Sequence, residues 1–311
     1  MKNLLLASTA LVVTAGMAAA EIKITGSANA GYYSGLGNAD AETVTSAAVP
    51  NGPGVAGVAA VTATSAETYT SSGVYSNAGI VATMSGVTDN GITFSTSVDA
   101  EAGTEIDQGD FEFDGPAGGT FGLGAVSMSG AFGTITFDDG GIDNLYDDDA
   151  TAADIKYSTT VGAVAVSIAA DAGSAADGTS VSASYTSGAM SFSGSGSSTA
   201  GDNSMSLAVT YALSDSISLT ADTDSTGGAA AVNSVSVTTA LNGVSITAAT
   251  DSASTWDIDL GYSVSGIALT YGTDENDAWD ASATYALGGG ATVKAGVNAE
   301  SSAYAGVSFA F

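Results

Sequence analysis

Carboxylates are the reactive side chains that dominate this sequence. Its 311 residues include 33 Asp and Glu but only 4 basic residues, all lysine, and the formal net charge is −29. Two carboxylates can hydrolyse a glycosidic bond, and several can coordinate a divalent cation through their oxygens. With so many acids, no single pair carries a specific signal. The charge repels nucleic acid and other polyanions, so we expect cations as partners and no nucleic acid.

Most enzyme chemistry is excluded by composition. The chain has 0 His and 0 Cys, so it cannot build a Ser-His-Asp triad, a Cys nucleophile or a zinc site of the usual kind. None of its 41 glycines lies in the strand-GxxxxGK-helix context of a phosphate-binding loop. We therefore predict that the protein is not an enzyme and requires no cofactor.

The densest acidic stretch is FDDGGIDNLYDDDATAAD, Phe137 to Asp154. Its carboxylates are those of Asp138, Asp139, Asp143, Asp147, Asp148, Asp149 and Asp154. Their spacing does not match an EF-hand loop. Calcium or magnesium binding, with Asp138, Asp139, Asp143 and Asp147 as the candidate calcium ligands, is therefore a hypothesis based on oxygen density.

The first 20 residues have the features of an export signal. Lys2 precedes an apolar run from Leu4 to Val13, and Ala18-Ala19-Ala20 forms a cleavage site before Glu21. The apolar run is shorter than the ~20 residues that a spanning helix needs. We predict a signal peptide over residues 1–20 and one β-barrel domain over 21–311, in which three lysines face all 33 acids.

Alternating hydrophobicity positions these acids. In WDIDLGYSV, Trp256, Ile258 and Leu260 fall on one face of an extended chain, and Asp257 and Asp259 fall on the other. No later window holds ~18 consecutive apolar residues, and no stretch has a period of 3.6. The pattern predicts β-strands with one apolar and one polar face.

Eighteen such segments follow Glu21, and two kinds of connection alternate between them. Short ones such as LNG and LGGG suit hairpin turns, whereas longer ones such as DTDSTGG and TDENDA are rich in Asp. Segments of ~10 tilted residues cover the ~25 Å apolar band of an outer-membrane barrel. We predict an all-β fold, a transmembrane antiparallel barrel of 16 to 18 strands with its tight turns at one end.

Two kinds of soluble protein could show the same alternation. A soluble barrel or sandwich would need bulky interior residues or covering helices, and the sequence offers neither. A solenoid or surface-layer protein would need a motif that recurs at a fixed length, and none is present. A closed barrel also accounts for the C-terminal stretch AYAGVSFAF, since its last strand must pair with its first.

Phe309 and Phe311 at that C-terminus resemble the aromatic signature that the barrel assembly machinery recognises in bacterial outer-membrane proteins. The segments MSGVTDNGITFSTSVDA, MSGAFGTITFDD and YALGGGATVKAGV are similar to matching segments of the general diffusion porins of Rhodobacter-type alphaproteobacteria. They cover the second to fifth strands and the C-terminal quarter. The resemblance implies a homotrimer of sixteen-stranded barrels, each a passive water-filled pore.

In that family the loop after the SGAFG hairpin folds into the barrel and narrows it. The resemblance therefore implies that the acids of Phe137 to Asp154 form the constriction, although Asp147 to Asp149 also suit a solvated loop tip. Family members oppose the loop with a basic cluster, which this chain lacks. The lumen-facing residues predicted from the alternation are Asp99, Glu101, Asp222, Asp224, Asp257, Asp259, Asp280 and Lys294, with Lys156 as a further cation.

These observations favour a cation-preferring porin of the cell outer membrane that passes small hydrophilic solutes. Its expected partners are outer-membrane lipid, lipopolysaccharide and the barrel assembly machinery. The alternative is a calcium-stabilised surface structural or adhesive β-protein without channel activity. The stretch from Leu36 to Ala66 is predicted to be a long mobile external loop.

Overall fold

The computed structural model describes residues 20–38, 43–46, 61–64, 72–109, 111–117, 121–146, 151–173, 178–199 and 202–311. The regular elements within these ranges are all β-strands. Their bounds are β1 (Glu21–Ser34), β2 (Gly37–Asn38), β3 (Thr43–Ser46), β4 (Val61–Thr64), β5 (Ser72–Val87), β6 (Thr93–Asp107), β7 (Glu112–Ala117), β8 (Phe121–Leu123), β9 (Val126–Gly130), β10 (Gly133–Asp143), β11 (Thr151–Val161), β12 (Val164–Ala170), β13 (Thr179–Ser187), β14 (Met190–Thr199), β15 (Asp202–Ser214), β16 (Ile217–Ser225), β17 (Val232–Leu241), β18 (Val244–Asp251), β19 (Trp256–Val264), β20 (Ile267–Asp274), β21 (Trp279–Gly288), β22 (Ala291–Asn298) and β23 (Ala303–Ala310). No helix among the described residues has the length and apolar character to cross a membrane.

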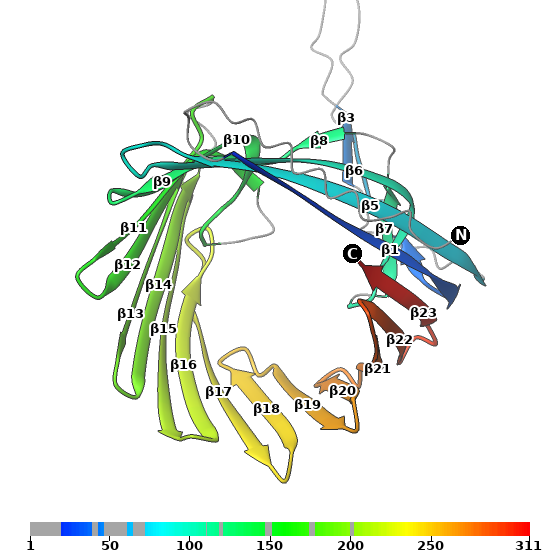
Figure 1. Cartoon of the computed structure of the whole chain (residues 1–311). Coiled ribbons are helices and arrows are strands. Elements are labelled where there is room, and N and C mark those ends of the chain that lie inside the picture. The colour runs from blue at the N-terminus through cyan, green and yellow to red at the C-terminus, as the bar shows by residue number, and fades with distance from the viewer. Residues whose placement is uncertain are drawn as a thin grey trace, which may run out of the picture.

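The strands close into one antiparallel barrel (Figure 1). β1 pairs with β5 on one side and with β23 on the other, from Ser27↔Ala310 to Ser34↔Ala303. β7, β8 and β9 follow one another along β6 as a single interrupted wall strand. The wall therefore has eighteen strands, which confirms the number predicted from the alternation. The sixteen strands implied by the resemblance are wrong for this chain.

The pairing register separates an apolar outer face from a polar inner face. Residues directly opposite each other on neighbouring strands share a face. One such row joins Ile246, Leu260 and Tyr271 across β18, β19 and β20, and Leu260 is still 36% exposed and Tyr271 39% exposed. The next row joins Thr247 and Asp259, which face the lumen. Large apolar side chains thus remain accessible on the outside of the wall, as the lipid-facing band of a membrane barrel requires.

The two ends of the barrel differ in their connections. At one end the strands are joined by tight turns, such as Asn242 and Gly243 between β17 and β18, which have positive φ angles of 51° and 86°. Asn and Gly are the residues that accept this conformation most readily. The longer connections are all at the other end. This confirms the predicted alternation of turns and loops except at SSTAGDN, predicted as a longer loop, where β14 ends at Thr199 and β15 begins at Asp202.

The C-terminus is a member of the wall. The amide of Phe311 donates to the carbonyl of Gly26 at 2.9 Å, and the amide of Gly26 donates to the carbonyl of Phe311 at 2.7 Å. Phe309 and Phe311 are exposed on the outer face. The predicted pairing of the last strand with the first is confirmed, whereas recognition by assembly machinery stays a prediction.

The predicted loop from Phe137 to Asp154 is wrong at both ends. β10 continues to Asp143 and β11 begins at Thr151, so the connection spans residues 144–150. The register shifts between Phe137 and Ile142, and Gly140 there has a φ of 71°. This bulge absorbs the extra residues, so the ladder resumes beyond it instead of ending.

Two predictions fall mainly outside the described residues. The signal peptide over residues 1–20 lies almost wholly there. The predicted loop from Leu36 to Ala66 lies mostly there, although its described part includes β2, β3 and β4, and β3 pairs with β4 as a separate hairpin. Leu36 itself is fully buried.

Candidate functional site

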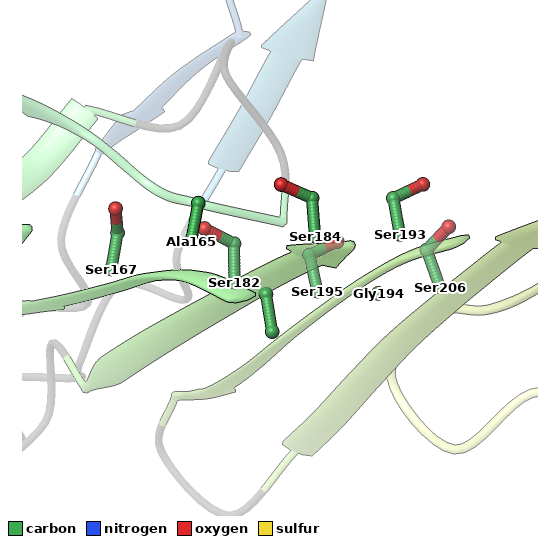
Figure 2. A pocket seen from close by; sticks show the side chains of 9 residues that line it. Ala165, Ser167, Ser182, Ser184, Ser193, Gly194, Ser195 and Ser206 are labelled. Atoms are coloured by element: carbon green, nitrogen blue, oxygen red, sulfur yellow. The ribbon is translucent and has the colours of Figure 1, made fainter. Parts of the chain in front are cut away.

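The lumen wall is built from the polar positions of the alternation. One row of directly opposed residues crosses β11 to β16 and consists of Ser158, Ser167, Ser182, Ser195, Ser206 and Asp224. The hydroxyl oxygens of Ser158 and Ser167 are 2.9 Å apart. Figure 2 shows the serine side chains of this region pointing to the same side of the sheet, over a shallow hollow of about 220 Å³. This part of the wall offers small, neutral hydroxyls.

The wall from β19 to β21 is acidic instead. Asp257 on β19 lies directly opposite Asp274 on β20. Asp259 and Asp280 lie on either side of Gly272, so that a Cβ atom placed there would be 3.1 Å and 2.7 Å from their Oδ1 atoms. Four carboxylates therefore face the lumen from three neighbouring strands. Asp274 was missed in the sequence because it was assigned to a loop.

The remaining predicted lumen residues also lie on the inner face by register. These are Asp99 and Glu101 on β6, Asp222 and Asp224 on β16, Lys156 on β11 and Lys294 on β22. Lys23 on β1 lies opposite Thr83 and faces the lumen as well. It was missed, although Ile22 and Ile24 on either side of it signal its orientation. The three lysines from Glu21 onward thus all face the lumen.

The connection between β10 and β11 folds inward and lies along the wall. Ile142, Ala153 and Ala169 are buried against one another, and Leu145 packs on them. The amide of Leu145 donates to Ser180 Oγ on β13 at 3.0 Å. Farther along, Tyr146 Oη donates to Asp224 Oδ1 on β16 at 2.7 Å. The connection therefore reaches past β12 to β15, and its described part lies against the inner face of the wall.

The phenol of Tyr146 is a donor at neutral pH. Partial burial raises its pKa above the ordinary value, and the carboxylate of Asp224 beside it acts in the same direction. Thr226 Oγ1 lies 2.6 Å from the phenol oxygen and 3.3 Å from Asp224 Oδ1. Since a carboxylate can only accept, the tyrosine proton points to Asp224, and the threonine hydroxyl completes the group.

The predicted constriction residues divide into three groups. Asp138, Asp139 and Asp143 lie on the extended part of β10, and Asp139 and Asp143 are exposed. Asp154 on β11 accepts hydrogen bonds from the amides of Gly140 and Ala172, both at 2.8 Å, so it fastens the base of the inward connection. Asp147, Asp148 and Asp149 lie outside the described residues.

A metal site was predicted at Asp138, Asp139, Asp143 and Asp147. Among the described residues, no three acidic side chains are close enough together to hold an ion. Asp147 is not among those residues, so the calcium hypothesis stays a prediction.

A second inward segment packs on the inner face of the wall and was missed in the sequence. The tip of the β6 and β7 hairpin brings Ile106 and Phe111 against Tyr75 and Tyr304, and Leu36 completes this buried cluster. The ring centroids of Phe111 and Tyr304 are 5.4 Å apart. The cluster lies on the lumen face of β1, β5 and β23 and covers that part of the wall.

Glycines provide the space for these rings. A Cβ atom at Gly31 would be 2.6 Å from the ring of Tyr75, and one at Gly296 would be 2.7 Å from the ring of Tyr304. The signal that could have revealed the cluster is therefore a tyrosine on the polar face opposite a glycine. Among the described residues, the two buried clusters have no member on β17 to β20.

Comparison with known proteins agrees with this architecture. A family model described as Gram-negative porin matches residues 7–302. A solved structure of Rhodopseudomonas blastica porin, a triple mutant, has a TM-score of 0.52 and 14% sequence identity, and the match covers 94% of this chain and 100% of that one. Another mutant of the same porin gives a TM-score of 0.51 at 16% identity, with the same coverage. No curated protein matches the chain.

Proposed function

Because this chain belongs to the Gram-negative porin family and forms an outer-membrane channel, we propose that it is a passive, water-filled pore for small hydrophilic solutes that prefers cations. The observation that carries the proposal is the charge of the lumen face. It combines many carboxylates with three lysines, and the chain has no arginine.

Electrostatics supports the cation preference. A fixed charge in a narrow passage with low-dielectric walls raises the local concentration of counter-ions and repels co-ions. Asp257, Asp259, Asp274 and Asp280 line the inner face of β19, β20 and β21. A cation that enters the pore therefore passes the carboxylates of β19 to β21. The neutral serines of β11 to β15 lie on the part of the wall that the inward connection contacts.

The test is the reversal potential in a planar bilayer under a potassium chloride gradient. Replacing Asp257, Asp259 and Asp280 together by Asn should lower the cation-to-anion permeability ratio by roughly twofold or more. The preference should also weaken as salt rises from 0.1 M to 1 M, because the Debye length falls from about 10 Å to about 3 Å.

A matched control removes the same charge elsewhere. Asp89, Asp215 and Asp277 are exposed in connections between strands, and Asn suits such positions. The triple Asn variant at these three sites should keep the original ratio. Equal effects of the two triple variants would show that net charge, and not the acidic wall, governs selectivity. Anion preference of the unmodified channel would overturn the electrostatic argument itself.

The family also supports an assembly proposal. We infer a homotrimer in contact with outer-membrane lipid and lipopolysaccharide, exported by residues 1–20 and inserted by the barrel assembly machinery through Phe309 and Phe311. An unheated gel tests this: the channel should migrate as a detergent-resistant, heat-modifiable oligomer. A soluble sheet released by a chelator would instead support the surface-protein alternative.

A further inference from the structure

We propose that Tyr146 positions the tip of the inward connection and thereby sets the width of the pore. We call the contact of Tyr146 on the connection with Asp224 and Thr226 the tip anchor; Asp224 is the β16 end of the row that begins at Ser158. This inference rests on the proposed function, because the width of the pore has an effect only if solutes pass through it.

The base of the connection is fixed without Tyr146. Asp154 accepts from two amides at the bulge, and Ile142 and Ala153 are buried against Ala169 of β12. The amide of Leu145 then reaches Ser180 on β13. These contacts hold the connection to β12 and β13, the two strands that follow its own hairpin.

The tip anchor spans a larger gap. Two strands, β14 and β15, separate Ser180 from Asp224 on the wall. The side chain of Tyr146 hydrogen-bonds Ser204 on β15 as well as Asp224 on β16, so the bond from Tyr146 to Asp224 is the farthest fixed point of the described connection. It joins residues 78 positions apart in the chain.

The hydrogen bonds of the tip anchor are strong enough to keep the connection against the wall. The phenol donates at 2.7 Å to a charged acceptor, and such bonds are roughly twice as strong as neutral ones. Thr226 adds its hydroxyl at 2.6 Å from the same phenol oxygen. Phenylalanine in place of Tyr146 would keep the ring and lose the hydrogen bonds to Asp224, Thr226 and Ser204.

The tip anchor also assigns a second role to a lumen acid. Asp224 contributes to the negative charge of the wall, and in addition it positions the connection. Asp222, two residues earlier on the same face, accepts a hydrogen bond from Ser234 Oγ, and it has no hydrogen bond to the part of the connection that the structure describes. Variants of these two aspartates therefore distinguish the effect of losing a lumen charge from the effect of losing the contact that positions the connection.

The chain permits a direct structural test because it contains no cysteine. Spin labels at Asn144→Cys on the connection and Ala221→Cys on the outer face of β16 report the distance between the tip and the wall. The unmodified tip should give one narrow distance distribution. With Tyr146→Phe added, the fraction of molecules whose connection lies away from the wall should rise on the order of tenfold, because a hydrogen bond to a charged group is lost.

A functional test follows in planar bilayers. Tyr146→Phe should broaden the distribution of single-channel conductance values and raise the open-channel noise. It should also change the size at which neutral polymers are excluded from the pore. Tyr285→Phe, on the lipid-facing side of β21, is the matched control and should change none of these. Asp224→Ala should reproduce the noise, whereas Asp222→Asn should shift ion selectivity alone.

The outcomes separate the two proposals. An unmodified protein that fails to conduct would refute the channel, yet the spin labels would still decide whether Tyr146 fixes the tip. A conducting protein in which Tyr146→Phe alters neither the distance distribution nor the polymer exclusion would refute the tip anchor. Migration on an unheated gel verifies that each variant is folded.

Discussion

The opposite faces of β15 offer a sharp test of membrane insertion. Leu207 points outward and is 49% exposed, close to the middle of a 13-residue strand. Ala208 is the next residue, and its side chain faces the lumen between Ser193 and Asp222. One arginine placed at either position changes the charge equally but meets lipid in one case and water in the other.

The expected difference is large. Arginine on the lipid face costs about 2–4 kcal/mol at the bilayer midplane and about 0–1 kcal/mol near the interfaces. Leu207→Arg should therefore lower the folding equilibrium constant by about 30- to 700-fold, since each 1.4 kcal/mol is tenfold. Ala208→Arg should be tolerated, because Asp222 lies directly opposite. Ile246 is the third residue of β18, nearer a turn, so Ile246→Arg should cost less than Leu207→Arg.

A urea titration of folding into lipid vesicles measures these differences. The midpoint should fall strongly for Leu207→Arg and remain close to that of the unmodified protein for Ala208→Arg. Equal losses at the two neighbouring positions would refute the assignment of faces and, with it, the membrane barrel. A loss confined to Ala208→Arg would mean that the sheet is inverted.

Three further predictions concern packing, salt and the inward connection. Gly31→Val should cost about 1–3 kcal/mol, because its Cβ would overlap the backbone carbonyl oxygen of Ala305 and the ring of Tyr75, and the temperature at which the folded band is lost on a gel reports the change. A chelator in low salt should reduce thermal stability, since carboxylates that outnumber cations need screening or bridging; unchanged melting would contradict this. Replacing Asp143 and the acids at 147–149 by Asn should reduce the cation preference if those side chains reach the lumen. An unaltered reversal potential would place them outside the pore.

The wall of the barrel could be predicted because a strand has a period of two. Each apolar residue in WDIDLGYSV fixes the orientation of its neighbours, so Asp257 and Asp259 were assigned to the lumen without knowledge of their partners. Turn residues such as Asn242 and Gly243 mark where one strand ends and the next begins, so the number of strands could also be predicted from local sequence. Both signals lie within a few residues of the feature that they specify.

The inward segments could not be predicted in the same way, since their contacts join distant parts of the chain. Tyr146 and Asp224 are 78 positions apart, and neither residue has a local signal for the other. The cluster of Tyr75, Phe111 and Tyr304 likewise joins three separate strands or turns. The end of the strand near Asp143 was predicted too early, because a pair of glycines usually indicates a loop. In the structure, a bulge at Gly140 lets strand pairing continue beyond that pair.

The seam between β1 and β23 has a kinetic consequence. It includes the hydrogen bond from Ser302 Oγ to the carbonyl of Gly35, which joins residues 267 positions apart. Loop-closure entropy makes such pairing late and slow, because each strand between the two partners must first find its neighbour. Until then the apolar faces of the strands have no membrane to cover them and are exposed to aggregation. The strong negative charge opposes that aggregation in the unfolded chain, so the carboxylates that line the finished pore also protect the protein while it is being assembled.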